Sequence, residues 1–119
     1  MAEENAFIGY GVCEYNYKII DNIIKLFPKV DFEKVLIRND DESIDYDEVC
    51  IYDMLDTIGD KSLCETIEVF PVEEFVFLGK SYENIPDDMT HGEFKKNVQT
   101  ELKKLGFKKR ECTPMCAVS

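Results

Sequence analysis

The spacing of apolar residues predicts a strand followed by a helix at the start of the chain. Residues 6–14 alternate bulky apolar side chains with Gly9 and Gly11, a pattern typical of a strand with one bare face. Asn16 can cap the helix that follows. Residues 31–37 fit either a helical turn or a short strand, because so short a run has no decisive periodicity. The apolar positions of the helix recur at helical spacing: Ile19, Ile20, Ile23, Ile24 and Phe27.

The middle of the chain predicts a second helix and then a hairpin. Asp45 and Glu48 have the spacing of a capping box, and apolar residues follow at helical spacing as far as Gly59. This predicts a helix of about 13 residues that ends at the glycine. Residues 65–72 and 74–80 alternate as strands, and they are close enough in sequence to pair as a hairpin.

The clearest helix signal lies near the carboxyl end. Thr90 and Glu93 form a capping box at its start. Gly106 followed by Phe107 is typical of a Schellman ending, in which the glycine turns the backbone and the apolar residue closes the last turn. One apolar stripe runs between these two signals: Phe94, Val98, Leu102 and Leu105.

Together these elements predict a two-layer α+β domain, in which a small antiparallel or mixed sheet packs against about three helices. At 119 residues the chain is long enough for one hydrophobic core and too short for two. We expect a single domain over residues 1–107 and a flexible, basic, cysteine-containing tail over residues 108–119. The expected core consists of Ile8, Val12, Ile20, Ile23, Ile24, Phe27, Leu55, Val69, Phe75, Phe77, Phe94, Val98, Leu102 and Leu105.

Charge is distributed unevenly along the sequence, whose net charge is −11. Residues 31–88 carry 18 acidic and 4 basic side chains, whereas residues 89–119 carry 3 acidic and 7 basic ones. Such a division indicates a charged interaction surface on a folded scaffold. It disfavours direct nucleic-acid binding by the body of the domain, because contacts with phosphates need a basic face.

The densest acidic stretch, residues 39–60, is the predicted partner-binding surface. No lysine or arginine interrupts it, and its two tyrosines can anchor a partner. Carboxylates fixed on a scaffold can replace a phosphate backbone, the principle by which small acidic inhibitors of nucleic-acid-handling enzymes and acidic immunity proteins work. We expect a non-enzymatic inhibitor or regulator that binds a basic surface of a nucleic-acid-handling protein, in a viral or mobile-element setting. The predicted contact residues are Asp40, Asp41, Glu42, Asp45, Tyr46, Asp47, Glu48, Tyr52, Asp53 and Asp56.

The sequence has no recognisable catalytic, metal or nucleotide motif. His91 is its only histidine, and no cysteine stands at a spacing that predicts a catalytic pair with it. There is no C-x-x-C pair, and the acidic stretch fails as an EF-hand because Tyr46 stands where glycine must turn. The sequence also lacks G-x-G-x-x-G and the phosphate-binding loop, so we expect neither an enzyme nor a cofactor.

A second hypothesis is a small-ligand-binding, sequestering protein. The bare face of the first strand, together with aromatic residues on and after it, could wall a pocket. The residues concerned are Gly9, Tyr10, Gly11 and Tyr82.

A third hypothesis concerns the carboxyl end, where Cys116 begins a C-a-a-X sequence that ends at Ser119. With upstream lysines and Cys112 as a second acylation site, this would make a prenylated, membrane-anchored adaptor. Contact with a membrane is expected only in that case. Otherwise we expect a cytoplasmic protein with reduced thiols, since the chain has an acidic amino terminus, no apolar run long enough to span a membrane and five irregularly spaced cysteines.

Overall fold

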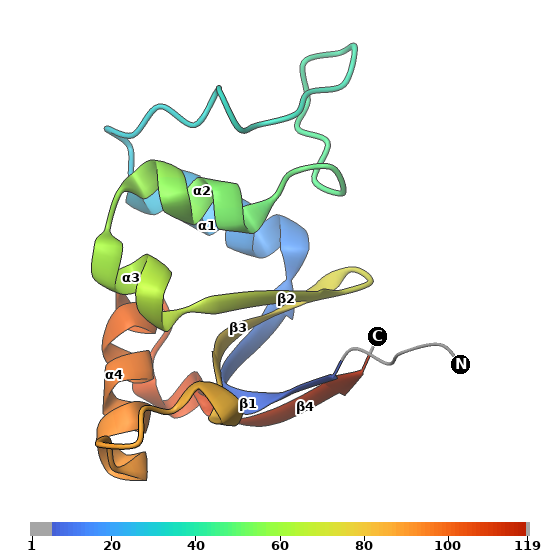
Figure 1. Ribbon diagram of the computed structural model, residues 1–119. Helices are drawn as coiled ribbons and strands as arrows, with labels where there is room; N and C mark the ends of the chain where they lie inside the picture. The colour runs from blue at the N-terminus through green and yellow to red at the C-terminus, as the bar shows by residue number, and fades with distance from the viewer. Residues whose placement is uncertain (1–5, 119) are drawn as a thin grey trace.

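A four-stranded antiparallel sheet forms one layer of the molecule (Figure 1). The computed structural model describes residues 6–118. Its strands lie in the order β2-β3-β1-β4, and each neighbouring pair is antiparallel. The strands are β1 (Ala6–Tyr15), β2 (Glu68–Val72), β3 (Phe75–Ser81) and β4 (Thr113–Val118).

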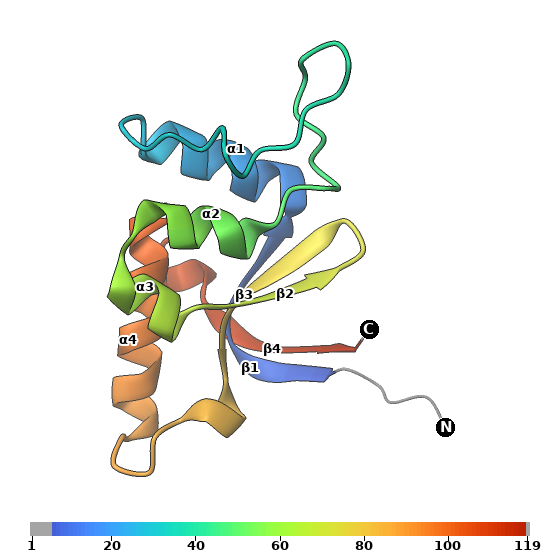
Figure 2. The ribbon, with the colours of Figure 1, turned by 45° about the horizontal axis from the view of Figure 1, so that its top comes forward.

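Helices on one side of this twisted sheet form the second layer (Figure 2). Inward side chains of β1 and β3, such as Tyr10 and Leu78, join the apolar sides of the four α-helices in one core. This arrangement confirms the expected two-layer α+β domain. The helices are α1 (Asn16–Leu26), α2 (Ile51–Ile58), α3 (Lys61–Thr66) and α4 (His91–Lys104), with the 3-10 turns η1 (Tyr82–Asn84) and η2 (Lys109–Glu111).

α4 begins and ends as its sequence predicts. The Thr90 hydroxyl accepts a hydrogen bond from the N–H of Glu93 at 3.1 Å and donates to its carboxylate at 3.2 Å. At the other end Gly106 has a φ of 90°, and the N–H of Phe107 donates to the carbonyl of Leu102 at 3.1 Å. This is the Schellman geometry, and Phe107 is buried beside it.

The acidic helix starts later than its sequence indicates. α2 begins at Ile51, and the N–H of Glu48 closes a turn on the carbonyl of Asp45 instead of belonging to a capping box. The short α3 is not predicted by the apolar pattern. It depends on its cap, Asp60, whose carboxylate accepts a hydrogen bond from the N–H of Leu63 at 3.1 Å. β2 therefore begins later than expected.

β3 turns the opposite side to the core from the one predicted. Leu78 lies opposite Val12 in the sheet, and both are buried. Cross-strand neighbours share a face, so Phe75 and Phe77 lie on the other face, where they are half-buried. Ile8 is 55% exposed, because β1 extends past the end of β3 there. The other expected core residues are buried (Val12, Ile20, Ile23, Leu55, Phe94, Val98, Leu102, Leu105) or half-buried (Ile24, Phe27, Val69).

The carboxyl end belongs to the sheet, which corrects the expected flexible tail. β4 pairs with β1, with Met115 opposite Gly9 and Thr113 opposite Gly11. The pairing satisfies an edge of β1 that would otherwise stay open, and Met115 keeps only 8% of its surface exposed. The domain therefore continues beyond residue 107, as far as residue 118.

Candidate functional site

The acidic stretch begins with a projecting loop, here called the acidic loop (residues 39–43). It stands out from the segment between α1 and α2, at the opposite end of the molecule from α4 (Figures 1 and 2). A bridge between Arg38 and Ile44 closes it. The Arg38 guanidinium donates to the carbonyl of Glu42 at 2.7 Å and to both carboxylate oxygens of Glu33. Arg38 thus fixes the loop while its charge is matched by Glu33.

Three exposed carboxylates occupy the tip of the acidic loop, on Asp40, Asp41 and Glu42. The hydroxyl and the N–H of Ser43 donate to Asp41 at 2.5 and 3.0 Å, and these hydrogen bonds lower the pKa of Asp41. Glu42 has a φ of 72°, the left-handed conformation that turns the chain back. The loop therefore holds its negative charge in a fixed turn.

Two adjoining hollows lie between the base of this segment and the β2–β3 hairpin, and together they are called the acidic cleft. They share Asn16 and Asp47 and have volumes of about 550 and 400 Å³. Among the described residues, no lysine or arginine lines either hollow. The carboxylates that line the acidic cleft belong to Asp45, Asp47, Glu48, Glu73 and Glu74.

A row of aromatic rings runs from the acidic cleft to the face of the sheet that is turned away from the core. Tyr46 meets Tyr17 edge to face at 6.2 Å, Tyr17 meets Tyr15 at 5.7 Å, and Tyr15 stacks on Phe75 at 4.5 Å. The Tyr46 hydroxyl donates to Asp21 at 2.7 Å, which raises the pKa of Tyr46. Tyr17 is 46% exposed, so the row offers apolar area beside the carboxylates.

The structure gathers only part of the predicted partner-binding set around the acidic cleft. Tyr52 lines the larger hollow and is 52% exposed. Asp53 and Asp56 lie apart from the cleft on the exposed side of α2. The members at the cleft are Asp45, Tyr46, Asp47, Glu48 and Tyr52, while Asp40, Asp41 and Glu42 stay in the acidic loop.

Sequence reasoning missed the part of the cleft that comes from distant segments. Glu73 and Glu74 form the turn of the hairpin, and the N–H of Asn16 donates to the carbonyl of Glu74 at 2.8 Å. The side-chain amide of Asn16 also donates to the carbonyl of Tyr46 at 2.5 Å. An acidic pair between two predicted strands was a visible signal for Glu73 and Glu74, but their approach to Tyr46 depends on the fold.

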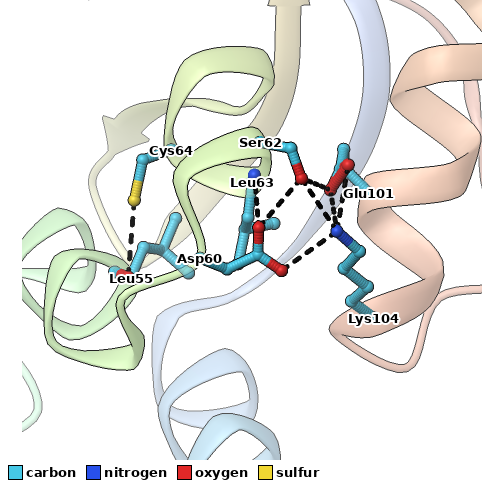
Figure 3. A network of polar contacts seen from close by, with 7 residues as sticks. All are labelled: Leu55, Asp60, Ser62, Leu63, Cys64, Glu101 and Lys104. Carbon is cyan, nitrogen blue, oxygen red and sulfur yellow. Dashed lines mark hydrogen bonds and ion pairs between the residues drawn. The ribbon is translucent and has the colours of Figure 1, made fainter.

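A second polar cluster joins α3 to α4 (Figure 3). The Lys104 ammonium lies 2.7 Å from a carboxylate oxygen of Glu101 and 3.0 Å from one of Asp60. It also lies 3.0 Å from the Ser62 hydroxyl, the spacing of a serine–lysine nucleophile and base. Hydrogen bonds to Glu101 and Asp60 raise the pKa of Lys104, so it stays charged and has no lone pair to take a proton from Ser62. The cluster therefore acts as a structural tie.

The residues of the small-ligand hypothesis do not meet around one cavity. Tyr10 packs in the core, and its hydroxyl accepts a hydrogen bond from Gln99 at 2.8 Å. Gly11 lies on the opposite face of β1, against the backbone of β3. Tyr82 packs beside the rings of His91 and Phe94. Gly9 is buried in β1 opposite Met115.

The residues of the lipidation hypothesis lie at and just before β4. Cys116 is exposed and pairs through its backbone with Ile8. Cys112 is half-buried, and burial raises the pKa of its thiol. Ser119, the last position of the C-a-a-X sequence, lies outside the described residues. Modification of Cys116 by an enzyme that needs an extended peptide would require the end of β4 to separate from β1.

Comparison of the chain with family profiles, with curated proteins and with solved structures gave no match. Within residues 6–118, no helix is long and apolar enough to cross a membrane. No group of three or more histidine, cysteine, aspartate or glutamate side chains in this part of the chain is arranged to hold a metal ion.

Proposed function

We propose that this protein is a non-enzymatic interaction protein whose acidic cleft binds a basic surface of a partner protein. The observation that carries the proposal is the combination in one place of five carboxylates with the exposed rings of Tyr17 and Tyr52. Carboxylates attract a basic partner over a distance, and exposed tyrosines supply the contact area that holds it. An arginine of the partner could bind both kinds of group, because its guanidinium pairs with carboxylates and stacks on aromatic rings.

The partner we propose is a protein that itself handles nucleic acid. Such a protein carries a basic groove shaped for a polyanion, and a scaffold with fixed carboxylates can occupy that groove in place of the phosphates. Binding there would block or regulate the partner's own ligand. The acidic loop begins at Asn39, which lines the smaller hollow, and it projects from the molecule (Figure 1), so it would extend the contact along the groove.

A charge-reversal variant tests this proposal once a partner has been captured from the native source and purified. Asp45→Lys, Asp47→Lys and Glu48→Lys together should weaken binding by at least about tenfold, or about 1.4 kcal/mol, because lysines then face a basic surface. The salt dependence of the affinity should flatten at the same time, since fewer charges take part. Isothermal titration calorimetry at two salt concentrations measures both.

The matched control reverses three exposed acids away from the cleft, Glu83→Lys, Asp87→Lys and Asp88→Lys, with the same change in net charge. The control should bind the partner nearly as the unmodified protein does. Equal losses in the two variants would mean that net charge alone drives association. Unchanged binding in the first variant would remove the cleft from the mechanism.

A further inference from the structure

The most basic surface of this acidic protein is a groove along α4, here called the lysine groove. It has a volume of about 930 Å³ and lies between the outer side of α4 and the segment that leads into η2. Among the described residues, no acidic side chain lines it. Five lysines do: Lys95, Lys96, Lys103, Lys108 and Lys109.

In the part of the chain that the structure describes, none of these five lysines has a carboxylate partner, in contrast to three other lysines of the chain. Lys104, Lys80 and Lys61 each lie within 4.0 Å of an acidic side chain. Within residues 6–118, none of the lysines of the groove makes such an ion pair. The ammonium of Lys95 lies 5.5 Å from the centre of the Tyr10 ring. The chain has a net charge of −11, yet five lysines without ion pairs lie together in one groove. They make the local electrostatic potential positive, so the groove attracts anionic groups.

The shape of the groove suits a segment of chain more than a compact ion. Its lining residues run along α4 from Gly92 to Lys103, a length of about 16 Å at the helical rise. A groove of this length exceeds a single carboxylate or phosphate and leaves room for a tight turn that presents several carboxylates. Its apolar floor comes from Phe107, which is 7% exposed.

We infer that the lysine groove receives the acidic loop of a second copy of this chain. The acidic loop has three exposed carboxylates in five residues and projects clear of the helices (Figures 1 and 2). It lies at the opposite end of the molecule from α4, so it cannot fold back into its own groove. Each molecule therefore has a free acidic projection at one end and a free basic groove at the other.

A second copy fits the groove better than a nucleic acid does. Single strands are held by exposed aromatic rings as well as by cations, whereas the rings at this groove, Tyr10 and Phe107, are 6% and 7% exposed. A nucleic acid would also have to approach a molecule whose net charge is −11. A second copy instead places its most acidic projection against the basic end. The contact is heterologous, so it leads to head-to-tail chains unless its rotation closes a ring.

This inference goes beyond the proposed function, because it assigns a role to the lysine groove, which the partner contact does not use. The acidic loop takes part in both contacts, so a partner and a second copy would compete for it. Sedimentation velocity of the full chain tests it. In about 0.1 M salt, where charges act over about 10 Å, the average sedimentation coefficient should rise with protein concentration. In about 1 M salt, where the range falls to about 3 Å, this rise should be lost.

Reversal of charge in the groove, with Lys96→Glu, Lys103→Glu and Lys109→Glu, should hold the protein at the monomer value in low salt. The matched control is Lys29→Glu, Lys34→Glu and Lys61→Glu, which makes the same change in net charge at exposed lysines outside the groove. The control should keep the rise. Loss of the rise in both variants would overturn the inference, because general repulsion would then explain it.

A mixing experiment gives the sharper result. The loop variant, Asp40→Asn, Asp41→Asn and Glu42→Gln, should also be monomeric alone. Mixed in equal amounts with the groove variant, it should form a dimer and nothing larger, because one intact loop meets one intact groove, while the remaining loop is uncharged and the remaining groove is acidic. Formation of that dimer also shows that both variants are folded.

Two further outcomes overturn the inference. One is a wild-type protein that stays at the monomer value at every concentration in low salt, together with a mixture that forms no dimer. The other is binding of a labelled single-stranded oligonucleotide by the wild type and the loop variant but not by the groove variant, with no self-association, which would assign the groove to nucleic acid. Neither outcome tests the proposed function, because that function depends on the acidic cleft. The groove variant leaves the cleft unchanged, so its binding to a captured partner can be measured separately.

Discussion

Gly11 and Gly79 face each other across β1 and β3 at a place where no side chain fits. A Cβ on Gly11 would lie 2.0 Å from the carbonyl oxygen of Leu78, and one on Gly79 would lie 2.2 Å from that of Tyr10. The obstacle in each case is the backbone of the neighbouring strand, which cannot move aside as a flexible side chain can. The bare face of β1 is therefore a consequence of how closely the two strands approach.

Gly11→Ala should lower the free energy of unfolding by about 1–3 kcal/mol or more, because the added methyl group overfills a site bounded by backbone. Chemical denaturation followed by circular dichroism measures the change. The control is Gly92→Ala on the exposed first turn of α4, where the nearest atom to the new Cβ is the Thr90 hydroxyl at 3.9 Å. There alanine should be neutral or stabilising by up to about 1 kcal/mol. Equal effects at both glycines would contradict the packing explanation.

Single residues could be predicted where their reason lies in nearby sequence. The pairing of Thr90 with Glu93, and the turn at Gly106 and Phe107, are local signals, and the structure confirms both. The role of Gly11 depends on a partner in a distant strand. The sequence around Gly11 therefore showed that one face of β1 lacks side chains, but it did not show whether a ligand or a neighbouring strand approaches that face.

At the scale of elements, α3 is held in place by contacts to α4. Asp60 caps α3 and also accepts a hydrogen bond from Lys104 at 3.0 Å (Figure 3). The hydrogen bond from Lys104, followed by those from Leu63 and Ser62, lowers the pKa of Asp60 from 3.8 to about 2. A helix of six residues is too short to be stable alone, so this tie matters for its position.

The tie predicts a pH-dependent contribution to stability. The pKa of Asp60 is lower in the folded state, so folding is favoured above the ordinary value of 3.8, and the contribution is lost as the pH falls toward about 2. Asp60→Asn keeps an N-cap oxygen for Leu63 but removes the charge that Lys104 contacts. It should be less stable than the wild type at neutral pH, and the difference should shrink as the pH falls below 3.8 and through about 2.

Denaturant titrations of both proteins across this pH range provide the measurement, with Asp88→Asn at an exposed loop position as the control. A deficit of Asp60→Asn that is the same at every pH would show that the loss comes from geometry and not from charge.

Elements with an apolar stripe of their own were predictable, whereas those defined by distant partners were not. The expected caps at Asn16 and Asp45 do not form, because α1 begins at Asn16 itself and α2 begins at Ile51. α1 and α4 follow from the apolar stripes within their own sequences. The face that β3 turns to the core is set by its register with β1, where Leu78 meets Val12. β4 has no pattern of its own and is a strand because β1 has an open edge for it. The missed part of the acidic cleft, at Glu73 and Glu74, has the same origin.

At the scale of the whole molecule, charge is separated between two ends. The acidic loop and the acidic cleft lie toward one end, and the lysine groove lies along α4 at the other (Figure 1). The sequence shows that residues 31–88 are acidic and residues 89–119 basic, but it does not place the two segments at opposite ends of the molecule. It does not predict the cleft or the groove, which arise from how the segments pack. Gathering like charges opposes folding, so a surface of this kind is expected where binding uses it.

Asp56→Lys separates stability from binding in a single substitution. Asp56 lies near the carboxyl end of α2, which has no basic residue in its last turn. A lysine there favours the helix dipole and reduces repulsion within residues 39–60, so the free energy of unfolding should rise by about 0.3–1 kcal/mol. Asp56 is an exposed member of the predicted partner-binding set, so the same variant should bind the captured partner more weakly. Asp88→Lys, with an equal change in net charge, should leave the free energy of unfolding and the affinity nearly unchanged.

An Asp56→Lys protein that gains stability and keeps full affinity would confine partner binding to the acidic cleft and the acidic loop. An Asp56→Lys protein that loses stability would show that the acidic side of α2 does not oppose folding.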